Sequence, residues 1–300
     1  MTTATKPSDN NSPKMDSKLS WLPKKTFELE ITIPQEKIKE TYKHVLAEMA
    51  QKTTLKGFRQ GKAPLEMVEK HLGKEAIYEE VVQHIVSSAY FDAVRQHNLH
   101  PIVNPRITPV SMQEDKDWVV KATACEIPEV KLGDYKTAIK GLNAKSKIWT
   151  PDKASQVEKV KEKDSKANLD QIFDELLKQA TIEIPDLLIE SETNRLLTQL
   201  VDQVNAVGMT VQQYLDSKGK TQESLRAEYA QAAAKTLKLE FILAKIAEDE
   251  GITVTEKEVE DIISKTQDPY AKKSFKSPEQ RNYLALILRK QKTIDFLNSL

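Results

Sequence analysis

Apolar periodicity lapses in one long stretch of this chain, between Lys136 and Lys166, and that interruption limits how the rest can fold. Lysine outnumbers aspartate and glutamate together within it, and no apolar stripe of helix or strand spacing is visible. About thirty residues of this composition cannot bury enough apolar surface to form a core of their own. We therefore interpret residues 136–166 as a protease-sensitive linker, with room for one loose helix, between two separately folded parts.

The part before the linker mixes strand and helix patterns. From Phe27 to Ile33 apolar residues alternate with polar ones, which is typical of a strand with one solvated face. Two further strands are predicted at Ile107–Met112 and Trp118–Ile127, joined as a hairpin by a charged turn. Helical spacing between the first two strands predicts helices, among them a short one over Leu65–Leu72 that Gly73 ends and a longer one over Lys74–Asn98. We expect an α+β domain over residues 23–135, a three-stranded antiparallel sheet with helices.

Residues 167–300 carry helical patterns throughout. Thr210 and Thr255 each stand three residues before a Gln or Glu, which is the spacing of a capping box at a helix start. The longest expected helix, Gln222–Glu250, has a broad apolar face and ends at a glycine. No apolar heptad persists, so a coiled coil is not expected, whereas a compact bundle and open helical arms both fit the pattern. We expect an all-α domain here.

Charge and cysteine content limit the partners and the compartment. Lys plus Arg and Asp plus Glu both number 45, so an anionic partner must be met by a local patch. The single cysteine, Cys125, excludes a disulfide framework, fits a reducing cytoplasm and reads as a small buried hydrophobe. Residues 1–22 are polar, lack a secretory signal and are expected to be a disordered tail. No apolar run approaches the roughly 18 residues of a membrane span, so no membrane partner is expected.

The stretch GFRQGKAP, from Gly57 to Pro64, lies between two helical patterns. Two glycines four residues apart do not suit a helix, and a proline suits the first turn of the next one. The stretch therefore predicts a loop that turns Phe58 and its cationic neighbours outward, toward a partner with phosphates and an apolar or stacking surface. An ordinary turn with Phe58 tucked inward fits the spacing as well.

Four cations surround this loop, namely Lys52, Lys56, Arg59 and Lys62. Such a cluster can neutralise several phosphates and make binding depend on salt. The alternative is a solvated helix end, because lysines near a helix C-terminus also offset the helix dipole.

Three motifs resemble the bacterial trigger factors. GFRQGKAP resembles their G-F-R-x-G-K-x-P signature, although Gln60 stands where many members carry Lys. KLGDY, Lys131–Tyr135, resembles the end of their first domain, and TIEIPDLLIESE, Thr181–Glu192, resembles part of their C-terminal domain. The resemblance covers residues 24–135 and 167–300.

The resemblance implies an ATP-independent chaperone that docks at the ribosomal exit tunnel and holds nascent or unfolded polypeptides, without cofactor or metal. Its partners would be protein and rRNA of the large ribosomal subunit, together with unfolded chains. Formation of a weak homodimer is left as an open alternative. The ribosome-binding residues would be Gly57, Phe58, Arg59, Gln60, Gly61, Lys62 and Pro64. Client contacts are expected from some exposed members of a set on the longest helix: Leu225, Tyr229, Phe241 and Ile242.

No catalytic signature is visible, whether G-x-S-x-G, a Walker loop, H-E-x-x-H or C-x-x-C. Most trigger factors carry a peptidyl-prolyl isomerase domain of the FK506-binding-protein type where this chain has its linker, and that linker is too short to hold one. We therefore expect no enzyme. The alternatives are a peptidyl-prolyl isomerase, or an extracytoplasmic chaperone of the SurA or PrsA kind, which would carry a signal peptide and lack the loop motif.

Overall fold

The structure is a computed structural model that describes residues 15–113, 115–146, 159–265, 275 and 277–300. It divides into two compact units, Met1–Ile127 (unit 1) and Pro128–Leu300 (unit 2), which are described separately. The division falls before residue 135, where the sequence placed the end of the first domain. None of the helices in the described ranges is long and apolar enough to cross a membrane.

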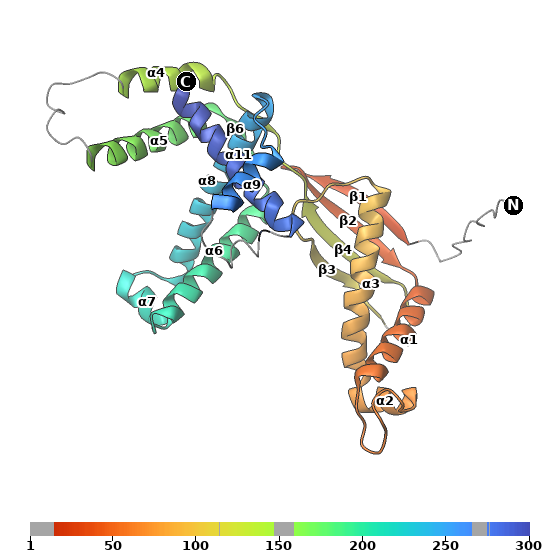
Figure 1. Ribbon diagram of the computed structural model, residues 1–300. Helices are drawn as coiled ribbons and strands as arrows, with labels where there is room; N and C mark the ends of the chain where they lie inside the picture. The colour runs from red at the N-terminus through yellow and green to blue at the C-terminus, as the bar shows by residue number, and fades with distance from the viewer. Residues whose placement is uncertain (1–14, 114, 147–158, 266–274, 276) are drawn as a thin grey trace. The chain divides into compact units, whose positions relative to one another are not determined.

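Unit 1 is an antiparallel four-stranded sheet of order β1-β2-β4-β3, with helices packed on one face (Figure 1). Its elements in chain order are β1 (Asp16–Leu22), β2 (Thr26–Ile33), α1 (Gln35–Lys52), α2 (Leu65–Leu72), α3 (Lys74–Gln96), β3 (Arg106–Ser111) and β4 (Trp118–Cys125).

The core of unit 1 forms between the sheet and helices α1 and α3. The apolar residues that alternate along β2 are fully buried, and β4 places smaller partners beside two of them. The register pairs Phe27 with Ala124 and Leu29 with Ala122, which leaves room for the helices above the sheet. Cys125 is buried as expected, and burial raises the pKa of its thiol to about 11.

The fourth strand, β1, corrects the expected disordered tail of residues 1–22 and the expected count of three strands. Asp16–Leu22 pairs with β2 along its whole length, and the ring of Trp21 packs edge-on against Phe27 at 5.8 Å between centroids. The hairpin turn has Lys24 and Lys25 at φ 59° and 54°. Asn-Gly usually fills such a turn, so its sequence signal was missing. Residues 1–14 lie outside the described residues.

The histidines near the end of α3 serve the packing of unit 1. His97 Nε2 lies 3.0 Å from Ser17 Oγ, which ties the end of α3 to β1. The backbone N–H of His100 donates to Glu126 Oε1 at 2.9 Å. Across the described ranges, no group of three His, Cys, Asp or Glu side chains could hold a metal ion.

Unit 2 is helical except for a two-stranded ribbon that pairs Val130–Lys131 with Thr181–Ile182. Helices α6 and α8 lie side by side and carry α7 at their far end (Figure 1). The elements are β5 (Val130–Lys131), α4 (Tyr135–Ser146), α5 (Lys159–Gln179), β6 (Thr181–Ile182), α6 (Asp186–Ala206), α7 (Val211–Lys218), α8 (Gln222–Asp249), α9 (Glu256–Lys265) and α11 (Pro278–Ser299).

Two hydrophobic cores stabilise unit 2. The larger one, here called the body core, joins α4, α5, α8, α11 and the ribbon around residues such as Ile172 and Ile246. The smaller one, here called the arm core, joins α6, α7 and the start of α8 around Leu200 and Leu215. The capping box predicted at Thr210 is confirmed, because its side chain accepts from the N–H of Gln213 and the Gln213 side chain returns the bond.

Helix α4 differs from the linker expected over residues 136–166. Ile139 is fully buried in the body core. Asn143 is 2% exposed, and its Nδ2 donates to the carbonyl oxygens of Leu297 and Asn298 at 3.2 and 3.4 Å, near the end of α11. Tyr135, Ile139 and Asn143 form the buried row of this helix at a spacing of four residues. The row begins outside residues 136–166 and ends in a polar residue, which is why no apolar stripe was recognised there. Residues 159–166, also expected to be linker, belong to α5, and residues 147–158 lie outside the described residues.

Candidate functional site

The GFRQGKAP segment forms two successive β-turns between α1 and α2. The turns are Leu55–Phe58 and Arg59–Lys62, and in each the last N–H donates to the first carbonyl at 3.0 Å. Gly57 and Gly61 occupy the third position of the two turns with φ of 93° and 74°. A type II turn requires a positive φ there, so the spacing of the glycines is the spacing of two consecutive turns.

Several contacts hold the base of this loop. Leu55 and Ala63 pack against the core of unit 1 from opposite ends of the loop. Thr53 Oγ1 donates to the carbonyl oxygen of Met49 at 2.7 Å, at the end of α1. Nearer the tip, Gln60 Nε2 donates to the carbonyl oxygen of Lys52 at 3.3 Å. Gln60 stands where many trigger factors carry Lys. In this chain its side chain satisfies a backbone carbonyl at the end of α1 that has no partner within the helix.

The tip of the loop faces outward. Phe58 is 37% exposed and takes no part in the core of unit 1, which favours the outward orientation over the inward alternative. Leu65 and Met67 in the first turn of α2 are also exposed. The sequence analysis did not single these two out, although both lie off the buried position of that helix, Val68.

The four cations around the loop are exposed and form no ion pair with any residue that the structure describes. Within the described parts of the chain, no carboxylate lies within ion-pair distance of Lys52, Lys56, Arg59 or Lys62. Their positive charge is therefore available to an anionic partner, which separates this cluster from the paired charges elsewhere on the surface. The loop brings together every residue that the sequence singled out between Gly57 and Pro64.

The four expected client contacts on α8 are less exposed than the sequence suggested. Leu225 is 6% exposed in the arm core and Ile242 is 0% exposed in the body core, so neither offers a free apolar surface. Tyr229 and Phe241 are partly buried against the same two cores. The broad apolar face of α8 is wide because two neighbouring groups of helices pack on it, not because part of it is open.

Helix α11 carries the exposed apolar face that α8 lacks. Tyr283, Leu286 and Ile287 share one side of this helix, and Leu286 is 64% exposed. Lys290 continues the same face and reaches Glu240 Oε1 of α8 at 3.2 Å. No client contact was expected from this helix. Its pattern could not distinguish a face covered by neighbours from a face left open.

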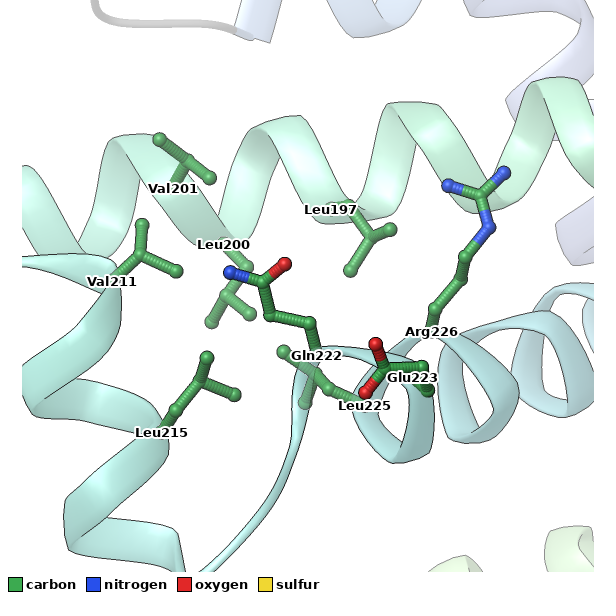
Figure 2. Close-up of a pocket in the computed structure, with 9 residues that line it drawn as sticks. All are labelled: Leu197, Leu200, Val201, Val211, Leu215, Gln222, Glu223, Leu225 and Arg226. Carbon is green, nitrogen blue, oxygen red and sulfur yellow. The ribbon is translucent and has the colours of Figure 1, made fainter.

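An apolar cavity of about 350 Å³ lies at the arm core, between α6, α7 and the first turn of α8. Figure 2 shows aliphatic side chains of the three helices converging on it, beside polar groups from the start of α8. Leu225, though nearly buried, forms part of its wall. The lining residues are Leu197, Leu200, Val201, Val211, Leu215, Gln222, Glu223, Leu225 and Arg226.

Relatives with known names match up to about half of this chain. The trigger factor of Clostridium kluyveri is 35% identical over 122 residues, which is 41% of this chain and 28% of the relative. The trigger factor of Thermoanaerobacter sp. strain X514 is 32% identical over 152 residues, which is 51% of this chain and 35% of the relative. The matched segments thus span only about a third of these curated relatives.

A solved structure has the same fold. It is described as "Promiscuous Substrate Recognition in Folding and Assembly Activities of the Trigger Factor Chaperone", and it matches 95% of this chain and 99% of its own with a TM-score of 0.61. Its sequence identity of 15% shows common architecture and nothing finer.

Two family models cover the chain almost end to end. The model for "Bacterial trigger factor protein (TF)" matches residues 15–172, more than half of the chain, and the model for "Bacterial trigger factor protein (TF) C-terminus" matches residues 152–299. The second match begins before the first one ends, so no stretch of this chain separates them. The chain belongs to the bacterial trigger factor family.

Proposed function

We propose that this chain is an ATP-independent chaperone that docks at the ribosomal exit tunnel and holds nascent or unfolded polypeptides. The observation that carries the proposal is the exposed loop, in which Phe58 is accessible beside four cations that form no ion pair within the described residues. The expected partners are protein and rRNA of the large subunit. An aromatic ring can stack on bases or enter an apolar pocket, while the cations pair with phosphates.

The docking half of this proposal predicts a defined salt dependence. If all four cations contact phosphates, the logarithm of the ribosome association constant should fall against the logarithm of salt concentration with a slope of about −3. Co-sedimentation of the whole chain with ribosomes over a range of salt concentrations measures this slope. Absence of binding at low salt, or binding that ignores salt, would contradict docking through this loop.

We propose that the exposed face of α11 and the arm cavity hold the clients. Both surfaces are apolar and open, whereas Ile242 is used by the protein's own core and Leu225 contributes only as part of the cavity wall. Full burial of one large apolar side chain contributes roughly 1–3 kcal/mol, so firm holding needs several contacts and tolerates many sequences. Such contacts require neither nucleotide nor metal.

The α11 face offers the sharpest test of client holding. Replacing Leu286 and Ile287 together by Asp should raise the concentration needed to suppress aggregation of a refolding client by about tenfold, because two apolar contacts become charged. Light scattering measures this concentration. Phe91→Asp is the control, since Phe91 is an equally exposed apolar residue of unit 1. If the control loses as much activity as the double variant, the holding surface is not on α11.

We also propose that the chain acts in the cytoplasm without isomerase activity. Support comes from the two family matches, which overlap at residues 152–172. The overlap leaves no stretch between them for the isomerase domain that most trigger factors carry at this place. Turnover of a proline tetrapeptide well above background would contradict the absence of isomerase activity. A weak homodimer is compatible with this proposal.

A further inference from the structure

Helices α1 and α2, which flank the docking loop, are joined by a hydrogen bond away from the loop itself. Tyr42 Oη donates to Glu69 Oε1 at 2.8 Å, and both side chains are partly buried. A bond with a charged acceptor is stronger than one between neutral groups. It therefore fixes the separation of the two helices that carry the ends of the loop.

The donor is held rigidly on the core. The ring of Tyr42 lies 5.0 Å from the ring of Tyr78 on α3, and Tyr78 lies 6.2 Å from Trp118 on β4. Three aromatic rings on three different elements thus form a continuous packed row. Contacts of this kind limit the rotation of each ring, so the hydroxyl of Tyr42 is aimed at α2 from a fixed point.

The acceptor lies on an element that needs outside support. Helix α2 has only eight residues, which is too short to be stable on its own in water. Val68 is its one fully buried residue, while Leu65 and Met67 are exposed. Leu72, at the end of the helix, is partly buried and packs against the same core. The bond to Glu69 adds a polar point of attachment between these two apolar ones, and it is the one that ties α2 directly to the side chain of Tyr42 on α1.

We infer that Tyr42 and Glu69 are positioning residues for docking, an inference that rests on the proposed function. Neither side chain belongs to the loop tip that would touch the partner. The pair holds α2, and through α2 the second turn of the loop, Arg59–Lys62, in one orientation before docking. A loop that is already ordered loses less conformational entropy on binding, so the pair raises affinity without a contact of its own.

Three single variants separate this role from a general loss of stability. Tyr42→Phe keeps the ring and removes the donor, Glu69→Ala removes the acceptor, and Glu69→Gln keeps an acceptor oxygen. Ribosome affinity at low salt should fall about three- to tenfold in the first two variants and by less in the third, whose neutral acceptor keeps a weaker bond. The double variant Tyr42→Phe with Glu69→Ala should bind no more weakly than either single variant, because both remove the same bond.

Hydrogen exchange tests the positioning without any ribosome. The amides of Phe58 and Lys62 close the two turns of the loop, and they should exchange severalfold faster in Tyr42→Phe than in the wild-type protein or in Glu69→Gln. If wild-type protein fails to bind ribosomes but this difference appears, the proposed function is wrong and the positioning stands. Unchanged exchange, or a Glu69→Gln variant as impaired as Glu69→Ala, overturns the inference.

Discussion

Gly133→Ala should lower the free energy of unfolding of unit 2 by about 2–4 kcal/mol. Gly133 has φ +63°, a conformation that disfavours side chains, and an added Cβ would lie 2.6 Å from the carbonyl oxygen of Gln179. That oxygen belongs to the backbone at the end of α5, so it cannot swing away as a flexible side chain would. Both effects act on the folded state and add to each other.

The backbone on both sides of Gly133 is held in place, so it cannot shift to move an added Cβ away from the carbonyl oxygen of Gln179. Just before it, β5 is fixed by its pairing with β6, Val130 to Ile182 and Lys131 to Thr181. Just after it, Tyr135 Oη donates to Glu250 Oε1 at 2.8 Å. Burial, and then this carboxylate, raise the pKa of Tyr135. The KLGDY motif therefore has a structural role in unit 2, where it connects the β5–β6 ribbon to α4 and, through Tyr135, to the end of α8.

Gly141→Ala is the matched control for this prediction. Gly141 lies inside α4, and an added Cβ would meet nothing within 4 Å. Since alanine favours a helix interior over glycine, this variant should gain up to about 1 kcal/mol. Urea unfolding followed by the helical circular dichroism signal measures both changes. If the two variants shift the midpoint alike, the close approach to Gln179 does not limit the residue at position 133.

Elements bounded by residues that start or end a helix or a turn, such as proline and glycine, could be predicted from the sequence. Elements without such boundary residues could not. Helix α2 was predicted over Leu65–Leu72, as found, because a proline precedes it and a glycine ends it. Strand β1 was missed because its turn has Lys24 and Lys25 where Asn-Gly would have signalled a hairpin. Helix α4 was missed because its buried row, Tyr135, Ile139 and Asn143, has helical spacing but ends in a polar residue.

The candidate site shows the same limit at the level of side chains. The glycine pair predicted the loop correctly, since backbone conformation depends on local sequence. The direction of Phe58 and the burial of Leu225 and Ile242 depend on which distant elements pack against them. An apolar stripe on a helix predicts that something covers it, but the stripe does not specify whether the protein itself or a client does so.

Replacing Phe58, Arg59 and Gln60 together by Ala should abolish co-sedimentation with ribosomes while the circular dichroism spectrum stays that of the folded protein. The variant removes the exposed ring, one of the four cations and the side-chain bond from Gln60 to the carbonyl of Lys52. Loss of one stacking contact costs about 1–3 kcal/mol, and loss of one phosphate contact reduces the salt slope by about one. The summed loss of binding free energy is large compared with that of a weak, reversible docking interaction, so no co-sedimentation should remain.

Helix α3 offers a control of the same composition in the same unit. Phe91, Arg95 and Gln83 are all exposed on this helix, so their joint replacement by Ala removes a ring, a cation and an amide without touching the loop. This control should bind ribosomes as the wild-type protein does. Single variants divide the effect, because Arg59→Ala should flatten the salt slope whereas Phe58→Ala should weaken binding equally at every salt concentration. A folded loop variant that still co-sediments would show that the ribosome contact lies elsewhere on the chain.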